Sequence, residues 1–263
     1  MELYLTTLIE GFLIAMYVCN CIRQIKSFLC YMRPLIIIDA AHLKGHYQGT
    51  NMVAVGMDGN NQIIPIATGV SQSETAESWI WFMRKLKECI GEVPNLAIIS
   101  DRHYGITAAC NAVFPNAFHG YCCRHLMLNT KMGSETMKCL YWKTCKAYTT
   151  EDFEKLMLEI RTVRPQAYKK LVEAGVEKWS RAHCPAQRYN YLTSNSVESI
   201  NALTKLVRHC PITALIEWFR SLLQSWYYHR RAKHAGNKIT KFLIAFSVAL
   251  GCTALHLSIT VYS

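Results

Sequence analysis

Two aspartates stand where metal-dependent phosphodiester chemistry would need them. Asp39 ends the apolar run Pro34–Ile38, and Asp101 ends the run Asn95–Ser100. An acid at the carboxyl end of a rigid strand opens to solvent and can hold Mg²⁺ or Mn²⁺ through its oxygens. A pair of such ions, about 4 Å apart, activates a nucleophile and stabilises a leaving oxygen. A single strand-ending aspartate more often caps the next turn, but two on neighbouring strands favour a metal site.

A third acid, Glu198, lies in the first turn of a helix that we expect over residues 195–207. The run Asn195–Glu198 is close to a capping box, in which the glutamate accepts from the first free N–H of the helix. The helix also follows a long helical block, so it could return to the sheet and bring its carboxylate to the aspartates. The residues alone leave both alternatives open.

Cys122 and His125 have the spacing of half a tetrahedral zinc site. The other ligands would have to come from a set with no decisive spacing, namely Cys110, Cys139, Cys145 and His119. We therefore favour a packed thiol and a hydrogen-bonded histidine over zinc. His42 and His103, close to the two aspartates, are expected to support the acids or to lie on the surface.

The composition indicates a globular chain with a polyanionic partner. The chain has 263 residues, 51% hydrophobic and 18% charged, enough for one large domain or two small ones. Its formal charge of +11 favours a polyanionic partner, although cationic membrane proteins and ordinary basic proteins share that charge. The 12 cysteines are scattered along a long chain without a cleavable-looking start, so we expect reduced thiols.

Two apolar stretches could be taken for membrane or targeting segments. No basic residue precedes Gly11–Ile22, so we expect a buried helix there, within a helical segment over residues 1–33. Phe242–Ser263 has no Asp, Glu, Lys or Arg and reaches the roughly 20 residues that span a bilayer. For this tail, residues 237–263, we favour truncation of a longer gene over a final core helix, and a membrane anchor last.

The chain pattern predicts an α/β fold with a mixed five-stranded sheet flanked by helices. The expected strands are 34–38, 51–57, 62–70, 95–100 and 117–122, with a hairpin turn at 58–61. Amphipathic helices are expected over 75–90 and 105–113. We divide the chain into a first core part (34–128), an all-helical insertion before Glu198 (129–192) and C-terminal core helices (193–236).

Basic residues gather late in the sequence. The segment from Thr193 to Lys241 contains eight Lys or Arg residues and only two acids. Within it, Arg230 and Arg231 closely follow Trp226. Phosphate contact with aromatic packing suits a DNA-facing helix, but a solvated helix with its aromatics in a core has the same pattern. Two basic residues beside the acids, Lys44 and Arg102, are weaker candidates for DNA contact.

Several of these motifs, in this order, resemble the MULE (Mutator-like element) transposase domain over roughly residues 30–235. The matching runs are Pro34–Gly45, Asp58–Asn61, Ile64–Ala67, Ser78–Phe82, Ile98–Asp101, Cys122–His125, Arg188–Tyr189 and Ser194–Asn201. The resemblance implies a ribonuclease H-like fold and a DDE triad of Asp39, Asp101 and Glu198 on Mg²⁺ or Mn²⁺. Cys122 and His125 match the family's Cys-x-x-His element.

The resemblance also implies an activity and its setting. Members of the family cut DNA at element ends with water as nucleophile and join the freed 3′ hydroxyl to target DNA. Transposases act as assemblies on paired ends, so a homo-oligomer in the nucleus is expected. Zinc and a membrane are not expected partners.

The sequence departs from the family pattern in two respects. Alanine follows Asp39 where the family has a glycine, so the local turn is expected to differ. We also find neither the amino-terminal DNA-binding region nor the later Cys-x-Cys and Cys-x-His segment of full-length members. The alternative is therefore a catalytically silent, transposase-derived nuclear DNA-binding regulator, or a truncated relic.

Overall fold

The computed structural model describes residues 7–9, 12–17, 22–46 and 48–235. The apolar tail predicted for residues 237–263 lies outside these residues. The chain divides into two compact units, one ending at Glu217 and the other starting at Trp218. None of the described helices is long and apolar enough to cross a membrane.

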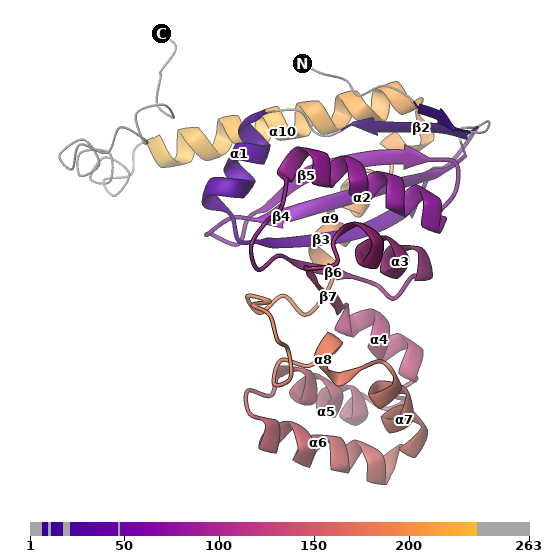
Figure 1. Cartoon of the computed structure of the whole chain (residues 1–263), viewed down its shortest axis with the longest axis vertical. Helices are drawn as coiled ribbons and strands as arrows, with labels where there is room; N and C mark the ends of the chain where they lie inside the picture. The colour runs from indigo at the N-terminus through magenta and orange to yellow at the C-terminus, as the bar shows by residue number, and fades with distance from the viewer. Residues whose placement is uncertain (1–6, 10–11, 18–21, 47, 236–263) are drawn as a thin grey trace, which may run out of the picture. The chain divides into compact units, whose positions relative to one another are not determined.

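A mixed sheet forms the centre of the first unit, with the strand order β1-β2-β5-β4-β3-β6-β7 (Figure 1). The strands are β1 (Thr7–Ile9), β2 (Phe12–Tyr17), β3 (Leu35–His42), β4 (Thr50–Met57), β5 (Ile63–Ser71), β6 (Ala97–Ser100) and β7 (Phe118–Tyr121). The pairs β3–β6 and β6–β7 are parallel, and the other pairs are antiparallel. The five expected strands are all present, and the arrangement is consistent with a ribonuclease H-like fold.

The predicted hairpin between β4 and β5 owes its turn to Asp58. The Asp58 carboxylate accepts from the backbone N–H of Asn60 and of Gln62, each at 2.8 Å. Asn61 takes a positive φ of 60°, which asparagine tolerates better than most residues. The turn therefore joins β4, the antiparallel partner of β3, to β5, so that β3, β4 and β5 form one meander.

The helical segment predicted for residues 1–33 is wrong in its first part. Strands β1 and β2 occupy Thr7–Ile9 and Phe12–Tyr17, and only α1 (Ile22–Tyr31) is helical. A short continuous apolar run fits a strand as well as a buried helix, so periodicity could not decide. Pairing with β2 covers the edge of β5 that would otherwise be open, which makes the sheet seven-stranded.

Helices cover both faces of the sheet. Helices α2 (Ala76–Ile90) and α3 (Tyr104–Val113) lie side by side on one face (Figure 1), where they bury Trp79, Phe82 and Ile106 against Ile36 and Ile38. Because strand side chains alternate, Asp39 points to the opposite face. Helix α9 (Asn195–Leu203) contacts β3 and β4 and reaches Asp39 there.

The residues between β7 and α9 form a helical block with a core of its own. Its helices are α4 (Cys123–Thr130), α5 (Glu135–Lys146), α6 (Thr150–Val163), α7 (Pro165–Glu173) and α8 (Val176–Trp179). Trp179 is fully buried and stacks on Tyr141 at 6.0 Å between ring centroids, while Phe153 packs against the same indole. The Tyr141 hydroxyl donates to the Cys123 carbonyl, which fixes α5 to α4.

The helix that contains Glu198 ends earlier than predicted. The helix expected over 195–207 stops at Leu203, and a 3-10 turn, η1 (Val207–His209), follows it. Arg208 in this turn donates to the carbonyls of His42 and Asn201, so η1 joins the end of β3 to α9. Helix α10 (Ile212–Ala235) begins after Pro211 and continues into the second unit.

Candidate metal centre between the sheet and helix α9

The two aspartates lie on neighbouring parallel strands. Ile37 on β3 pairs with Ile99 on β6, and each aspartate lies two residues farther along the chain. Asp101 directly follows β6, as predicted, but Asp39 does not end β3. The strand continues through Asp39, which pairs with Val53, to His42. The antiparallel partner β4 is long enough to hold these extra residues, which the apolar run alone could not indicate.

Asp39 is a carboxyl group in an environment that resists its charge. Burial raises the pKa of Asp39 to about 7, with further raising effects from the neighbouring charges of Asp101 and Glu198. The amide Nδ2 of Asn201 donates to Asp39 Oδ2 at 2.9 Å. The second polar atom of that amide, Oδ1, is buried and has no hydrogen-bond partner among the described residues. The surroundings of Asp39 thus carry too little positive charge to balance an ionised carboxylate.

Asp101 holds the turn between β6 and α3. Its Oδ1 accepts from the backbone N–H of His103 at 2.9 Å, so the turn-capping alternative considered for this residue is also realised. The preceding Ser100 hydroxyl lies 2.8 Å from His119 Nε2. Burial lowers the pKa of His119 to about 4, so this ring remains neutral near the acids.

Glu198 does not close a capping box. Ser194 is the N-cap of α9, and its backbone N–H donates to Cys122 Sγ at 3.3 Å instead of to Glu198. The two oxygens of Glu198 have different partners, since Oε1 accepts from the Ser194 hydroxyl at 3.1 Å and Oε2 accepts from Arg124 at 2.9 Å. The carboxylate is therefore held between the N-cap side chain of its own helix and Arg124 on α4.

The three acids form one electrostatic neighbourhood but not one ligand group. The charges of Asp101 and Glu198 act on Asp39, yet the acids are not a metal-ligand group within 4.8 Å among the residues that the structure describes. Oxygen donors and an excess of negative charge fit a hard divalent cation. A cation would supply the positive charge that Asp39 lacks. The carboxylates of Asp39, Asp101 and Glu198 would have to move closer together to bind one.

Cys122 and His125 lie beside Glu198 and share a polarised contact. Burial alone would raise the pKa of the Cys122 thiol, but hydrogen bonds with His125 and Ser194 hold that pKa below its ordinary value. The same hydrogen bond with Cys122 raises the pKa of His125 to about 9. The contact therefore makes the thiol more acidic and the imidazole more basic than either group would ordinarily be.

Sequence reasoning missed the residues that position this site. They are Arg124, which pairs with Glu198; Ser194, which contacts both Cys122 and Glu198; Asn201, which donates to Asp39; and Arg208. Asn201 is three residues after Glu198, a spacing that places both on one face of a helix and could have marked it. Arg124 lies between the two residues of the Cys-x-x-His element.

The predicted DNA contacts are basic side chains in both units. In the first unit, Lys44 and Arg102 are exposed and follow the two aspartates in sequence. In the second, Arg231 is exposed, and the Arg230 guanidinium lies 5.1 Å from the centre of the Trp226 ring. Of the two histidines beside the acids, His103 caps α3 and His42 is exposed near Thr50.

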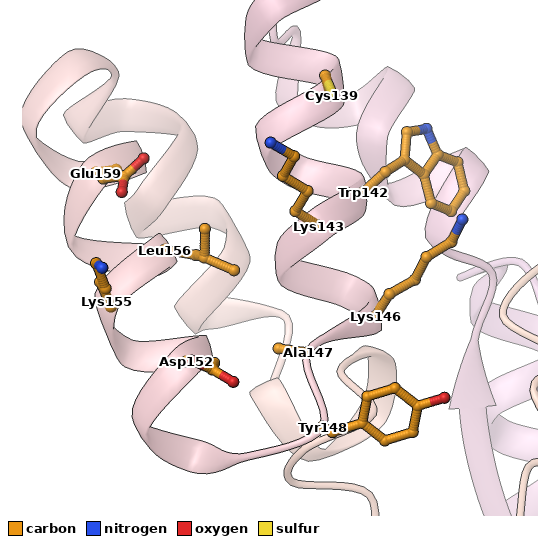
Figure 2. A pocket seen from close by; sticks show the side chains of 10 residues that line it. All are labelled: Cys139, Trp142, Lys143, Lys146, Ala147, Tyr148, Asp152, Lys155, Leu156 and Glu159. Atoms are coloured by element: carbon orange, nitrogen blue, oxygen red, sulfur yellow. The ribbon is translucent and has the colours of Figure 1, made fainter.

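A hollow of about 590 Å³ lies elsewhere, between α5 and α6 of the helical block (Figure 2). It is lined by Cys139, Trp142, Lys143, Lys146, Ala147, Tyr148, Asp152, Lys155, Leu156 and Glu159. None of the predicted site residues contributes to it. The candidate chemistry is therefore at the sheet edge and not in this hollow.

Comparison with known proteins finds a family and a relative to which the chain is similar. The MULE transposase domain family matches residues 35–129, a range that begins at β3 and ends in α4. The chain is also similar to Protein FAR1-RELATED SEQUENCE 4 of Arabidopsis thaliana, at 20% identity over 151 residues and 53% of this chain. The match spans only 20% of that relative's length. The comparisons therefore support a MULE transposase domain over residues 35–129.

Proposed function

We propose that this chain is the catalytic core of a DDE-type transposase, which cleaves and transfers DNA strands in a metal-dependent reaction. Asp39, Asp101 and Glu198 would hold Mg²⁺ or Mn²⁺. The helical block would be an insertion between the second and third acids of a ribonuclease H-like fold. The substrate would be DNA, the location the nucleus, and the working form an oligomer.

The observation that carries this proposal is the charge imbalance around Asp39. Three elements, β3, β6 and α9, bring carboxylates into one neighbourhood, where Asp39 has a pKa of about 7. Ionisation of an acid that is buried beside two other acids is costly unless a cation joins the group. A purely structural arrangement would more often pair such an acid with Lys or Arg.

The chain's own residues would position the acids for this chemistry. Bound divalent ions would activate the attacking water or 3′ hydroxyl and stabilise the leaving oxygen. Asn201 fixes one oxygen of Asp39, and the His103 N–H fixes one oxygen of Asp101. Lys44 and Arg102 follow the two aspartates in sequence and are exposed, so they would be the basic side chains that contact the phosphate.

Nicking of supercoiled plasmid tests the proposal. With Mg²⁺ or Mn²⁺ the wild-type chain should nick the plasmid, and Asp101→Asn should lose at least about a hundredfold in rate, the scale of losing one transition-state contact. Asp152→Asn on α6 makes the same change of charge at an exposed acid outside the site and should cut like wild type. Equal cutting by wild type and Asp101→Asn would contradict the proposed strand-cleavage activity.

One observation favours a second candidate, a transposase-derived DNA-binding protein without turnover. Arg124 already neutralises Glu198 at 2.9 Å, and Glu198 faces Cys122 and His125. A third acid that stays in this pairing could not complete a catalytic metal site. If this second candidate is correct, the chain should bind DNA but should not nick it when Mg²⁺ or Mn²⁺ is added.

A further inference from the structure

Three side chains of different chemistry converge where α4 begins beside α9. The Sγ of Cys122, a nitrogen of His125 and an oxygen of Glu198 all lie within 4.8 Å of one another. The Ser194 hydroxyl lies against all three, at 3.3 Å from Sγ, 3.5 Å from His125 Nδ1 and 3.1 Å from Glu198 Oε1. A hydroxyl has a single hydrogen, so it cannot donate to more than one of them at once.

The three ligand atoms lie only slightly farther apart than the ligands of a bound zinc ion. Zn²⁺ binds sulfur at about 2.3 Å and nitrogen or oxygen at about 2.0–2.2 Å, which places tetrahedral ligand atoms about 3.5 Å apart. His125 Nε2 and Glu198 Oε1 are 4.0 Å apart. Small rotations of two partly exposed side chains, His125 and Glu198, would bring the set to bonding distance.

The backbone around the cluster is fixed before any ion binds. Cys122 N–H donates to the Ser100 carbonyl at 2.7 Å, and Cys123 N–H donates to the Leu192 carbonyl at 2.8 Å. The Ser194 N–H bond to Cys122 Sγ ties the start of α9 to the same point. Cys122 and His125 are thus held on one helical turn, with Glu198 opposite them.

The donor set distinguishes this cluster from the site of the three acids. A thiolate and an imidazole are ligands that Zn²⁺ prefers and Mg²⁺ does not. Cys122 is fully buried, whereas the side chains of His125 and Glu198 are 34% and 29% exposed. Three protein ligands with one side open to solvent leave room for a fourth, exchangeable ligand.

We propose that Cys122, His125 and Glu198 bind one Zn²⁺, with water as the fourth ligand. Arg124 would keep Glu198 Oε2 while the metal takes Oε1, so the existing ion pair orients the ligand oxygen. This metal site uses two residues that the acid triad does not, and it shares Glu198 with that triad. Zinc bound here would therefore compete with the proposed strand-cleavage metals for Glu198.

Titration of the full chain with Co²⁺ tests the site without any need for activity. Cobalt replaces zinc in tetrahedral sites and gives a near-ultraviolet absorption from thiolate coordination. We expect one equivalent to produce this absorption and Zn²⁺ to abolish it. Cys122→Ser should remove it, while Cys139→Ser, a change at an exposed cysteine on α5, should leave it intact.

His125→Asn and Glu198→Gln guard against a Cys122 variant that does not fold. Both side chains are partly exposed, and each change should weaken Zn²⁺ binding by at least about ten- to a hundredfold, the loss seen even for outer partners of a metal. Absence of the absorption in folded wild type, or its persistence in Cys122→Ser, would overturn the zinc site.

The same titration separates this inference from the proposed strand cleavage. Asp101→Asn should abolish plasmid nicking yet keep the thiolate absorption. A chain that binds Co²⁺ through Cys122 but never nicks DNA would leave the zinc site standing and remove the nuclease. A chain that nicks DNA but does not give the absorption would support the nuclease and overturn the zinc site.

Discussion

Asp39 is a buried carboxyl group that has two other acids as neighbours. Its pKa rises from 3.8 to about 7 because it is buried and faces the negative charges of Asp101 and Glu198. The Asn201 amide is its neutral partner, at 2.9 Å. Without metal, the folded chain avoids the buried charge by keeping a proton on Asp39.

This proton should make the metal-free chain less stable as the pH rises. Below 3.8 Asp39 is protonated whether folded or unfolded, and between 3.8 and about 7 only the folded chain holds the proton. The stabilisation is therefore lost as the pH rises through about 7, on the order of 4 kcal/mol in all. Urea unfolding in a chelator at a series of pH values should show this fall.

Asp39→Asn is the matching variant, because it keeps the shape and removes the titration. Its unfolding free energy should change far less across the same pH interval, and Mg²⁺ should stabilise wild type at neutral pH more than the variant. An equally steep fall in Asp39→Asn would assign the pH dependence to other titrating groups.

At the scale of elements, local pattern predicted most of the sheet. The runs before Asp39 and Asp101, the hairpin at Asp58 and helix α2 follow from apolar periodicity and turn composition. These features are set by neighbours in sequence. Strand β2 was misassigned because an all-apolar run has no period, and its partner β5 lies some 50 residues away.

The site was predictable in its residue types but not in its contacts. Asp39, Asp101 and Glu198 were identified from strand ends, a helix start and family resemblance. The third member of the Cys122 and His125 cluster was not found among the cysteines and histidines considered, since it is Glu198. Only the contact of α9 with α4 brings these residues together, and the spacing of the residues in the sequence does not indicate that contact.

The contact between α4 and α9 should depend on one buried hydroxyl. Ser194 is fully buried, and its Oγ contacts Cys122 and Glu198. Ser194→Ala removes these bonds and leaves buried polar partners behind, so it should lower the unfolding free energy by about 1–3 kcal/mol. Urea denaturation measures the loss.

Ser199→Ala provides a matched control on the same helix. Ser199 is exposed, and its hydroxyl donates only to the Asn195 carbonyl one turn earlier. Its removal should change the unfolding free energy by no more than about 0.5 kcal/mol. Equal losses in both variants would mean that Ser194 acts through helix propensity and not through the contact of α9 with α4.

At the scale of the whole molecule, the excess of basic residues should appear as salt-dependent DNA binding. The chain carries 29 Lys and Arg against 18 Asp and Glu. Each cation that neutralises a DNA phosphate adds about −0.9 to the slope of log affinity against log salt concentration. The slope therefore counts phosphate contacts, whatever the DNA sequence.

Two double variants assign these contacts to one unit or the other. Arg230→Gln with Arg231→Gln tests the second unit, and Lys44→Gln with Arg102→Gln tests the first, beside the acids. If a pair contacts phosphates, its removal should reduce the size of the slope by about 1.8 and weaken binding to all sequences alike. Fluorescence anisotropy of a labelled duplex at several salt concentrations gives both quantities.

The control removes the same number of charges at lysines that already have partners. Lys85 and Lys169 each pair with a glutamate on their own helix, at 2.8 and 3.9 Å. Lys85→Gln with Lys169→Gln should leave the slope unchanged, because the slope depends on side chains that contact phosphates and not on the net charge of the chain. If all three double variants reduce the slope equally, the chain attracts DNA through its overall charge, and neither predicted set is an interface.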